Sequence, residues 1–104
     1  MTEAEATDAF AALSNPLRLR LLKHLVEAGA TGLTAGAAAK SIGASPSGAS
    51  FHLAALSEAE LIVAERQSRQ ILYRARFDRL GALIGYLLHD CCRNDQAVRS
   101  CCGL

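Results

Sequence analysis

The chain has 104 residues, of which 51% are apolar, 20% charged and 5% aromatic, with a formal net charge of +1. This length suits one compact domain with a modest core, which a second copy of the chain would help to stabilise. The sequence shows neither a secretory leader pattern nor an apolar run long enough to span a membrane, so we expect a cytoplasmic protein without a membrane partner. In that compartment the cysteines are expected to be thiols rather than disulfides.

The chain opens with two predicted helices. Thr2 followed by Glu5 is a capping-box signature, and the first helix is expected to end near Ser14. Asn15 can cap a second helix, because Pro16 suits the first helical position. Apolar residues then recur at helical spacing up to the glycines near residue 30.

Two further helices follow at close spacing. Thr34 is the expected cap of a helix over residues 35–41, which Gly43 ends, and Ser45 caps a helix over residues 46–59. Two helices joined by a tight glycine-containing turn indicate a helix-turn-helix motif. The apolar side of the second of these helices is expected to comprise Phe51, Leu53, Ala54 and Leu56.

The periodicity then changes to that of strands. Residues 61–66 and 70–75 are rich in β-formers and are separated by a polar turn, which predicts a hairpin. Asp78 is the expected cap of a last helix, which carries Cys91 at its end and breaks near Asn94-Asp95. No regular structure is assigned to residues 96–104.

The predicted chain is mainly α with one β-hairpin. Its order, four helices followed by a hairpin and a final helix, is that of a winged helix-turn-helix DNA-binding domain. The second helix of the motif enters the major groove with its first residues at base edges, and the hairpin contacts the phosphates or the minor groove. Residues 61–79 carry five arginines against two acids, although a solvated charged hairpin would show the same pattern. The candidate DNA-binding residues are Lys40, Ser45, Ser47, Gly48, Ser50, His52, Arg66 and Arg69, with packing as the other role open to His52.

Three segments resemble the ArsR/SmtB family of metal-responsive repressors. Residues 12–22 (ALSNPLRLRLL) resemble its opening signature, residues 47–56 (SGASFHLAAL) its recognition helix, and residues 69–73 (RQILY) its wing. The resemblance implies a homodimer formed through the first and last helices, which represses transcription on double-stranded operator DNA until an inducer binds. Residues 1–92 would be the DNA-binding and dimerisation domain, and residues 93–104 a cysteine-containing tail.

The sequence departs from the family pattern in the recognition helix and at two common sensor sites. Ala54 and Ala55 stand where basic residues are frequent, and Glu60 where Gly is common, so DNA affinity is expected to rest more on Lys40 and the wing arginines. Residues 35–39 lack the Cys-x-Cys motif of the best-known arsenic repressors. The last helix also lacks the histidine spacing of the zinc-binding type, since its candidate ligands are only Asp78, His89 and Asp90.

All four cysteines lie within the last fourteen residues, as Cys91-Cys92 and Cys101-Cys102. They resemble a third family type, in which vicinal cysteines at the end of the last helix and another in the tail respond to trivalent arsenic or antimony. As(III) prefers three soft thiolate ligands. Adjacent helical residues point about 100° apart, so Cys91 and Cys92 can bind one ion only where the helix frays. The tail can then add Cys101 or Cys102.

Other interpretations of the cysteines stay open at this stage. Four thiols would suit an ion such as Cd(II), Pb(II) is a further candidate, and two thiols would suffice for a methylated trivalent arsenical. A disulfide between the pairs would make a redox sensor, and the tail could be inert or bind a protein. Cys91 alone could be a buried apolar residue. A thiol enzyme is disfavoured, because the chain has neither a Cys-x-x-Cys motif nor a phosphate-binding loop.

Overall fold

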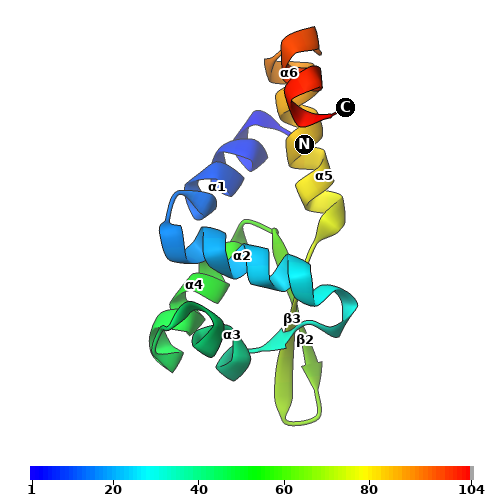
Figure 1. Ribbon diagram of the computed structural model, residues 1–104. Helices are drawn as coiled ribbons and strands as arrows, with labels where there is room; N and C mark the ends of the chain where they lie inside the picture. Colours follow the sequence, from blue (N-terminus) through cyan, green and yellow to red (C-terminus); the bar gives the residue numbers. More distant parts are fainter. Residues whose placement is uncertain (104) are drawn as a thin grey trace.

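The computed structural model describes residues 1–103, apart from the side chain of Cys102. It is elongated, 46 Å in its longest dimension, with the hairpin tip at one end and the last helix at the other (Figure 1). The elements in chain order are α1 (Glu3–Leu13), α2 (Pro16–Ala28), the short 3₁₀ helix η1 (Gly29–Thr31), β1 (Leu33–Thr34), α3 (Ala35–Ile42), α4 (Pro46–Glu58), β2 (Ile62–Gln67), β3 (Gln70–Ala75), α5 (Phe77–Gly85), the π-helix η2 (Tyr86–Cys91) and α6 (Gln96–Cys102).

The predicted caps of the first four helices are confirmed. The Thr2 hydroxyl accepts a hydrogen bond from the Glu5 N–H at 3.1 Å, and the Glu5 carboxylate accepts one from the Thr2 N–H at 2.9 Å. The Asn15 side chain accepts from the first turn of α2, and the Ser45 hydroxyl does the same for α4. Gly43 ends α3 in the left-handed conformation, with φ of 64°. These caps supply partners for N–H groups that a helix leaves unpaired.

The hairpin belongs to a three-stranded antiparallel sheet in the order β1-β3-β2. β1 is an addition to the prediction, because its two residues are too few to show an alternating pattern. Leu33 pairs with Tyr73 and Thr34 with Leu72, so β1 attaches the start of α3 to the hairpin. Ser68 and Arg69 alone form the turn between β2 and β3, with Ser68 in the left-handed region. The strands thereby fix the wing relative to the helix-turn-helix.

The core lies where α1, α2, α3 and α4 meet the base of the sheet. Its largest fully buried side chains are Leu21, Leu25, Leu53, Leu56 and Leu61. Alanines of α1 and α3 fill the remaining contacts and let the helices approach closely.

The predicted apolar side of α4 is wrong in two positions. Phe51 is 66% exposed and Ala54 is also exposed, whereas Ala49 and His52 are buried beside Leu53 and Leu56. The buried face of α4 is therefore turned relative to the predicted one.

The last helix differs from the prediction at both ends. Arg76, without a side-chain capping bond, occupies the position before α5, and Asp78 lies in the first turn, where its carboxylate pairs with Arg76 at 2.8 Å. Beyond Gly85 the helix continues as the π-helix η2, and a turn leads into α6, which Asp95 caps. α5 and these segments extend away from the body as an arm (Figure 1). Among the described residues, no helix combines the length and apolarity needed to cross a membrane.

Candidate nucleic-acid interface and thiol site

The exposed residues of α4 form one stripe along the helix, which starts at its N-terminus. Its exposed residues are Ser47, Ser50, Phe51, Ala54 and Glu58, the helical spacing of a single face. The stripe begins with the small, uncharged side chains of Ser47 and Ser50 and ends with the acidic side chain of Glu58. The N-terminal half is therefore the part of α4 that suits a polyanion such as DNA.

The first turn of α4 offers few N–H groups to a phosphate. Pro46 has no N–H, and the N–H of Gly48 already donates to the Ser45 hydroxyl at 3.1 Å. Ser45 thus serves as a cap in the free chain, and its hydroxyl also lies 3.3 Å from that of Ser47. The side chains of Ser47 and Ser50 are the exposed polar groups left at this end of the helix.

Arg18 of α2 connects two residues of α4 that differ in exposure. Its Nε donates a hydrogen bond of 3.2 Å to Nδ1 of the buried His52, and its guanidinium carbon lies 5.5 Å from the centre of the exposed Phe51 ring. Of the two roles open to His52, burial at 9% exposure supports packing. The sequence did not single out these contacts of Arg18, and it placed Phe51 on the apolar side of its helix, because contacts between residues of two helices leave no local signal.

The wing places positive charge beside the same face. Arg66 and Arg69 are exposed on β2 and at the turn. An open concavity of about 380 Å³ separates the wing from the helices, and both Ser50 and Arg69 line it. Lys40 is exposed in the last turn of α3.

Arg74 instead holds the base of the wing. Its Nε donates to the Ala30 carbonyl at 2.7 Å, and its guanidinium pairs with Glu65, which lowers the pKa of that carboxyl. Arg66 and Arg69 are thus the wing cations placed for a partner outside the chain.

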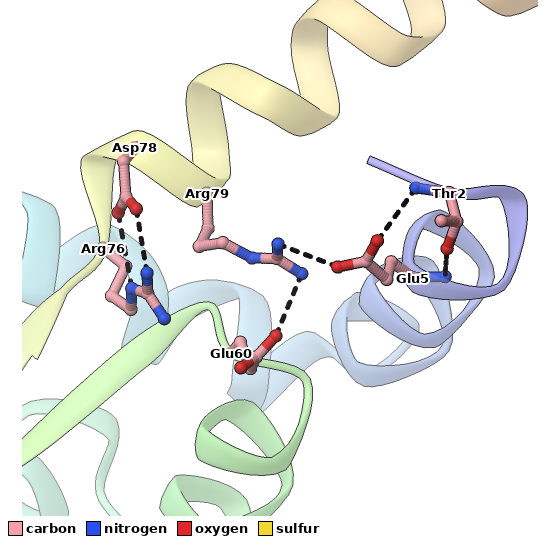
Figure 2. A network of polar contacts seen from close by, with 6 residues as sticks. All are labelled: Thr2, Glu5, Glu60, Arg76, Asp78 and Arg79. Carbon is pink, nitrogen blue, oxygen red and sulfur yellow. Dashed lines mark hydrogen bonds and ion pairs between the residues drawn. The ribbon is translucent and has the colours of Figure 1, made fainter.

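A network of charges joins the arm to the rest of the molecule (Figure 2). The guanidinium of Arg79 on α5 lies 2.9 Å from Glu5 of α1 and 3.2 Å from Glu60, which follows α4. Arg79 is the most buried of the three, with its side chain 17% exposed. Because Glu60 pairs with Arg79 at the C-terminal end of α4, its charge lies away from the start of the helix.

Three features of this network set its properties. The capping bond from the Thr2 backbone, together with the Arg79 guanidinium, lowers the pKa of Glu5 to about 2. Glu60 has a positive φ of 61°, which explains why Gly suits its position. Among the described residues, Arg79 Nε is a buried donor without a partner. One arginine therefore ties α5 to both α1 and the end of the recognition helix.

The cysteines lie at the far end of the arm. Cys91 ends η2 and is exposed, so the alternative that it is a buried apolar residue is wrong for this chain. Cys92 is partly buried, and Cys101 is exposed on α6. The fourth predicted ligand, Cys102, has its side chain outside the described residues. His89 is exposed in η2.

Among the described thiols, those of Cys91 and Cys92 interact with each other. Burial, followed by a hydrogen bond with the Cys91 thiol, raises the pKa of Cys92. Within the part of the chain that the structure describes, no three His, Cys, Asp or Glu side chains converge as a metal site.

The segment from η2 to the start of α6 has unusual backbone geometry. Arg93 and Asn94 are consecutive non-glycine residues with positive φ, of 53° and 58°. This conformation carries strain, and strain of this kind collects at switching segments. π-Helical turns such as η2 are likewise frequent at functional sites.

Comparison with known proteins gives one family and several related structures. A family model described as a helix-turn-helix domain matches residues 13–65. An ArsR-like transcriptional regulator from Rhodococcus sp. RHA1 has 28% sequence identity and a TM-score of 0.76, over 93% of this chain and 89% of the other. NolR from Sinorhizobium fredii has 32% identity and a TM-score of 0.64, over 84% and 85%.

A third related structure is described as a homodimer. It is the winged helix-turn-helix DNA-binding domain of Mb0332 from Mycobacterium bovis, a possible ArsR-family regulator, with 26% identity and a TM-score of 0.68 over 89% of this chain and 86% of the other. No curated protein gives a significant match. The fold predicted from the sequence, a winged helix-turn-helix, is confirmed.

Proposed function

The chain belongs to the ArsR-type winged-helix transcriptional regulators, and from this premise we propose a homodimeric repressor that leaves its operator when trivalent arsenic or antimony binds its C-terminal thiolates. Membership makes the protein a DNA-binding regulator and not an enzyme. The observation that carries the inducible part is the position of the thiols. They lie at the end of an arm that Arg79 ties to the recognition helix.

The dimer is supported by apolar surface on the arm. Phe77 and Ile84 of α5 are 55% and 56% exposed, and Phe10 of α1 is 41% exposed. A second copy that packs α1 and α5 against this surface would bury it. The M. bovis relative, described as homodimeric, is consistent with this arrangement. Two copies would present two α4 helices to half-sites about one helical turn apart.

The donor chemistry of the tail fits a thiophilic ion. Cys91 and Cys92 would supply two thiolates, and Cys101 or Cys102 the third, because soft sulfur ligands select soft ions. A trivalent arsenic or antimony ion supplies a centre that three sulfurs can surround. The thiols bind as thiolates. With arsenite, As(OH)3, each thiol proton leaves together with one arsenic hydroxide as water, so three thiols and one arsenite give three waters.

The response at the DNA would pass through α5. Rearrangement of residues 93–101 toward Cys91 changes the end of the arm, and the arm contacts the end of α4 through Arg79 and Glu60. A shift of α5 would therefore alter the orientation of α4 in each half of the dimer. A coupling of roughly 1–3 kcal/mol would lower operator affinity about 5- to 150-fold, enough for a switch.

The test measures binding to the DNA upstream of the protein's own gene while sodium arsenite is added under reducing conditions. We expect the wild-type protein to dissociate. We expect a Cys91→Ser, Cys92→Ser double variant to bind DNA equally well and to stay bound. Separate Cys101→Ser and Cys102→Ser variants identify the third ligand. Normal dissociation of the double variant would refute the thiol assignment while leaving DNA binding intact.

The same assay separates the alternative inducers. Cd(II) and Pb(II) replace arsenite in parallel titrations, and peroxide replaces it in a third. Release by peroxide alone, accompanied by a disulfide between the two cysteine pairs in mass spectrometry, would support redox sensing in place of ion binding.

A further inference from the structure

The most unusual residue on the recognition helix is Phe51. Its side chain is 66% exposed, in the middle of the outward stripe of α4. A large aromatic side chain at this exposure contributes little to the core and leaves apolar area in water. Its position in the stripe, one residue after Ser50, places it within the surface that faces DNA in this family of folds.

The ring of Phe51 is held in place from the protein side. The Arg18 guanidinium lies 5.5 Å from its centre, and the His52 ring meets it at an interplanar angle of 69° with centres 5.7 Å apart. His52 is in turn fixed by the hydrogen bond from Arg18. A side chain oriented in this way loses little conformational freedom when it makes a further contact.

The neighbours of Phe51 supply few hydrogen bonds for base recognition. Besides Phe51, the exposed residues of the N-terminal half of α4 are Pro46, Ser47 and Ser50, without the arginine, asparagine or glutamine that bind base edges in bidentate fashion. Apolar contact is the recognition that Phe51 offers. The apolar group in the major groove is the C5 methyl of thymine, against which phenylalanine is a known type of contact.

We propose that Phe51 reads a thymine methyl group in each operator half-site and is the main determinant of base specificity on α4. This proposal rests on the DNA-binding part of the proposed function and is independent of the inducer. It places the discriminating contact on the aromatic ring, while Arg66 and Arg69 of the wing provide affinity that does not depend on sequence.

The experiment uses a duplex that the full-length protein selects from a random-sequence library. Each thymine is replaced in turn by deoxyuridine, which pairs identically but lacks the methyl group. We expect one symmetry-related pair of positions to matter for the wild-type protein. Loss of one methyl contact should lower the affinity about fourfold. This fold-change corresponds to about 0.8 kcal/mol, because a tenfold change in affinity corresponds to about 1.4 kcal/mol.

The variants assign this effect to the ring. Phe51→Ala should bind the thymine and uracil duplexes equally, whereas Phe51→Leu should keep part of the preference because leucine is also apolar. Leu19→Ala is the matched control, since Leu19 is 56% exposed on α2 and its removal should leave the preference unchanged. All these positions are exposed, so circular dichroism should show the same fold.

The possible outcomes separate this proposal from DNA binding itself. A wild-type protein that binds the selected duplex but ignores every uracil replacement would overturn the proposal and leave the DNA-binding function standing. An undiminished thymine preference in Phe51→Ala would also overturn it. If Phe51→Ala changes only the oligomeric state, measured by analytical ultracentrifugation, the exposed ring belongs to an interface between copies and the proposal fails.

Discussion

Replacement of Gly32 by alanine should destabilise the protein and displace its wing. Gly32 has φ of 69° and ψ of −176°, a conformation that is essentially restricted to glycine. A Cβ at this position would lie 2.6 Å from the carbonyl oxygen of Tyr73 and 3.1 Å from atoms of Leu72 and Arg74. The closest atom belongs to the backbone of β3, which cannot move without disturbing its pairing with β1.

The size of the effect follows from these two costs. Holding alanine in this region of φ and ψ costs of order 1–3 kcal/mol, and a lost strand hydrogen bond adds about 1 kcal/mol. We expect the free energy of unfolding to fall by about 2–4 kcal/mol, and the Tm by roughly 4 °C or more for each kcal/mol. Operator affinity should also fall, because β1 joins the wing to the start of α3.

Urea denaturation followed by circular dichroism measures the change, at equal protein concentrations because dimerisation contributes to stability. Gly36→Ala is the matched control. Gly36 is within α3, and an added Cβ there meets nothing within 4 Å, so alanine should raise stability by up to about 1 kcal/mol. A Gly32→Ala protein within about 0.5 kcal/mol of wild type would refute the close approach of β1 and β3 on which this reasoning depends.

Three further predictions concern the charged groups. The pKa of Glu5 is lowered from 4.5 to about 2, so its contribution to stability is complete above pH 4.5 and is lost as the pH falls toward 2. In Glu5→Gln, the free energy of unfolding measured against pH should lack this decrease between pH 4.5 and 2. Arg69→Ala should reduce the slope of log affinity against log salt by about 2 per dimer, whereas Arg93→Ala in the tail should not change it. Arg79→Gln should weaken the arsenite-induced loss of operator affinity about 2- to 30-fold in the same titration, whereas Arg76→Gln, whose ion pair among the described residues is with Asp78, should leave it normal.

Local signals in the sequence were sufficient to predict most of the helices and the hairpin. Thr2, Asn15, Thr34 and Ser45 each stand directly before a helix, and each forms the capping bond expected of it. β1 was missed because its pairing with β3 depends on residues about forty positions away. The cap assigned to Asp78 was wrong because α5 begins one residue earlier, at Phe77, and the Asp78 carboxylate pairs with the nearby Arg76.

The nucleic-acid interface was less predictable than the fold, because it also depends on contacts between residues far apart in the sequence. The sequence placed Phe51 on the apolar side of its helix and left both DNA contact and packing open for His52. The structure exposes Phe51 and buries His52, for whose imidazole Arg18 supplies a partner. The Arg79 network joins residues 5, 60 and 79, and such a contact has no signature in the linear sequence.

The thiol site could be predicted only in part. Cys91 and Cys92 are adjacent in the sequence and interact in the structure. No third ligand converges with them among the described side chains, which do not include that of Cys102. Each of Cys101 and Cys102 therefore stays a prediction.

The most direct test is an ultraviolet absorption titration of the reduced protein with arsenite, run beside a titration of its operator complex. We predict a thiolate-to-arsenic charge-transfer band that saturates at one ion per chain, with DNA released over the same range of arsenite. Loss of the band in the Cys91→Ser, Cys92→Ser variant would complete the assignment. The absence of a band in the wild-type protein, or a complex that stays intact once the band has saturated, would contradict the account.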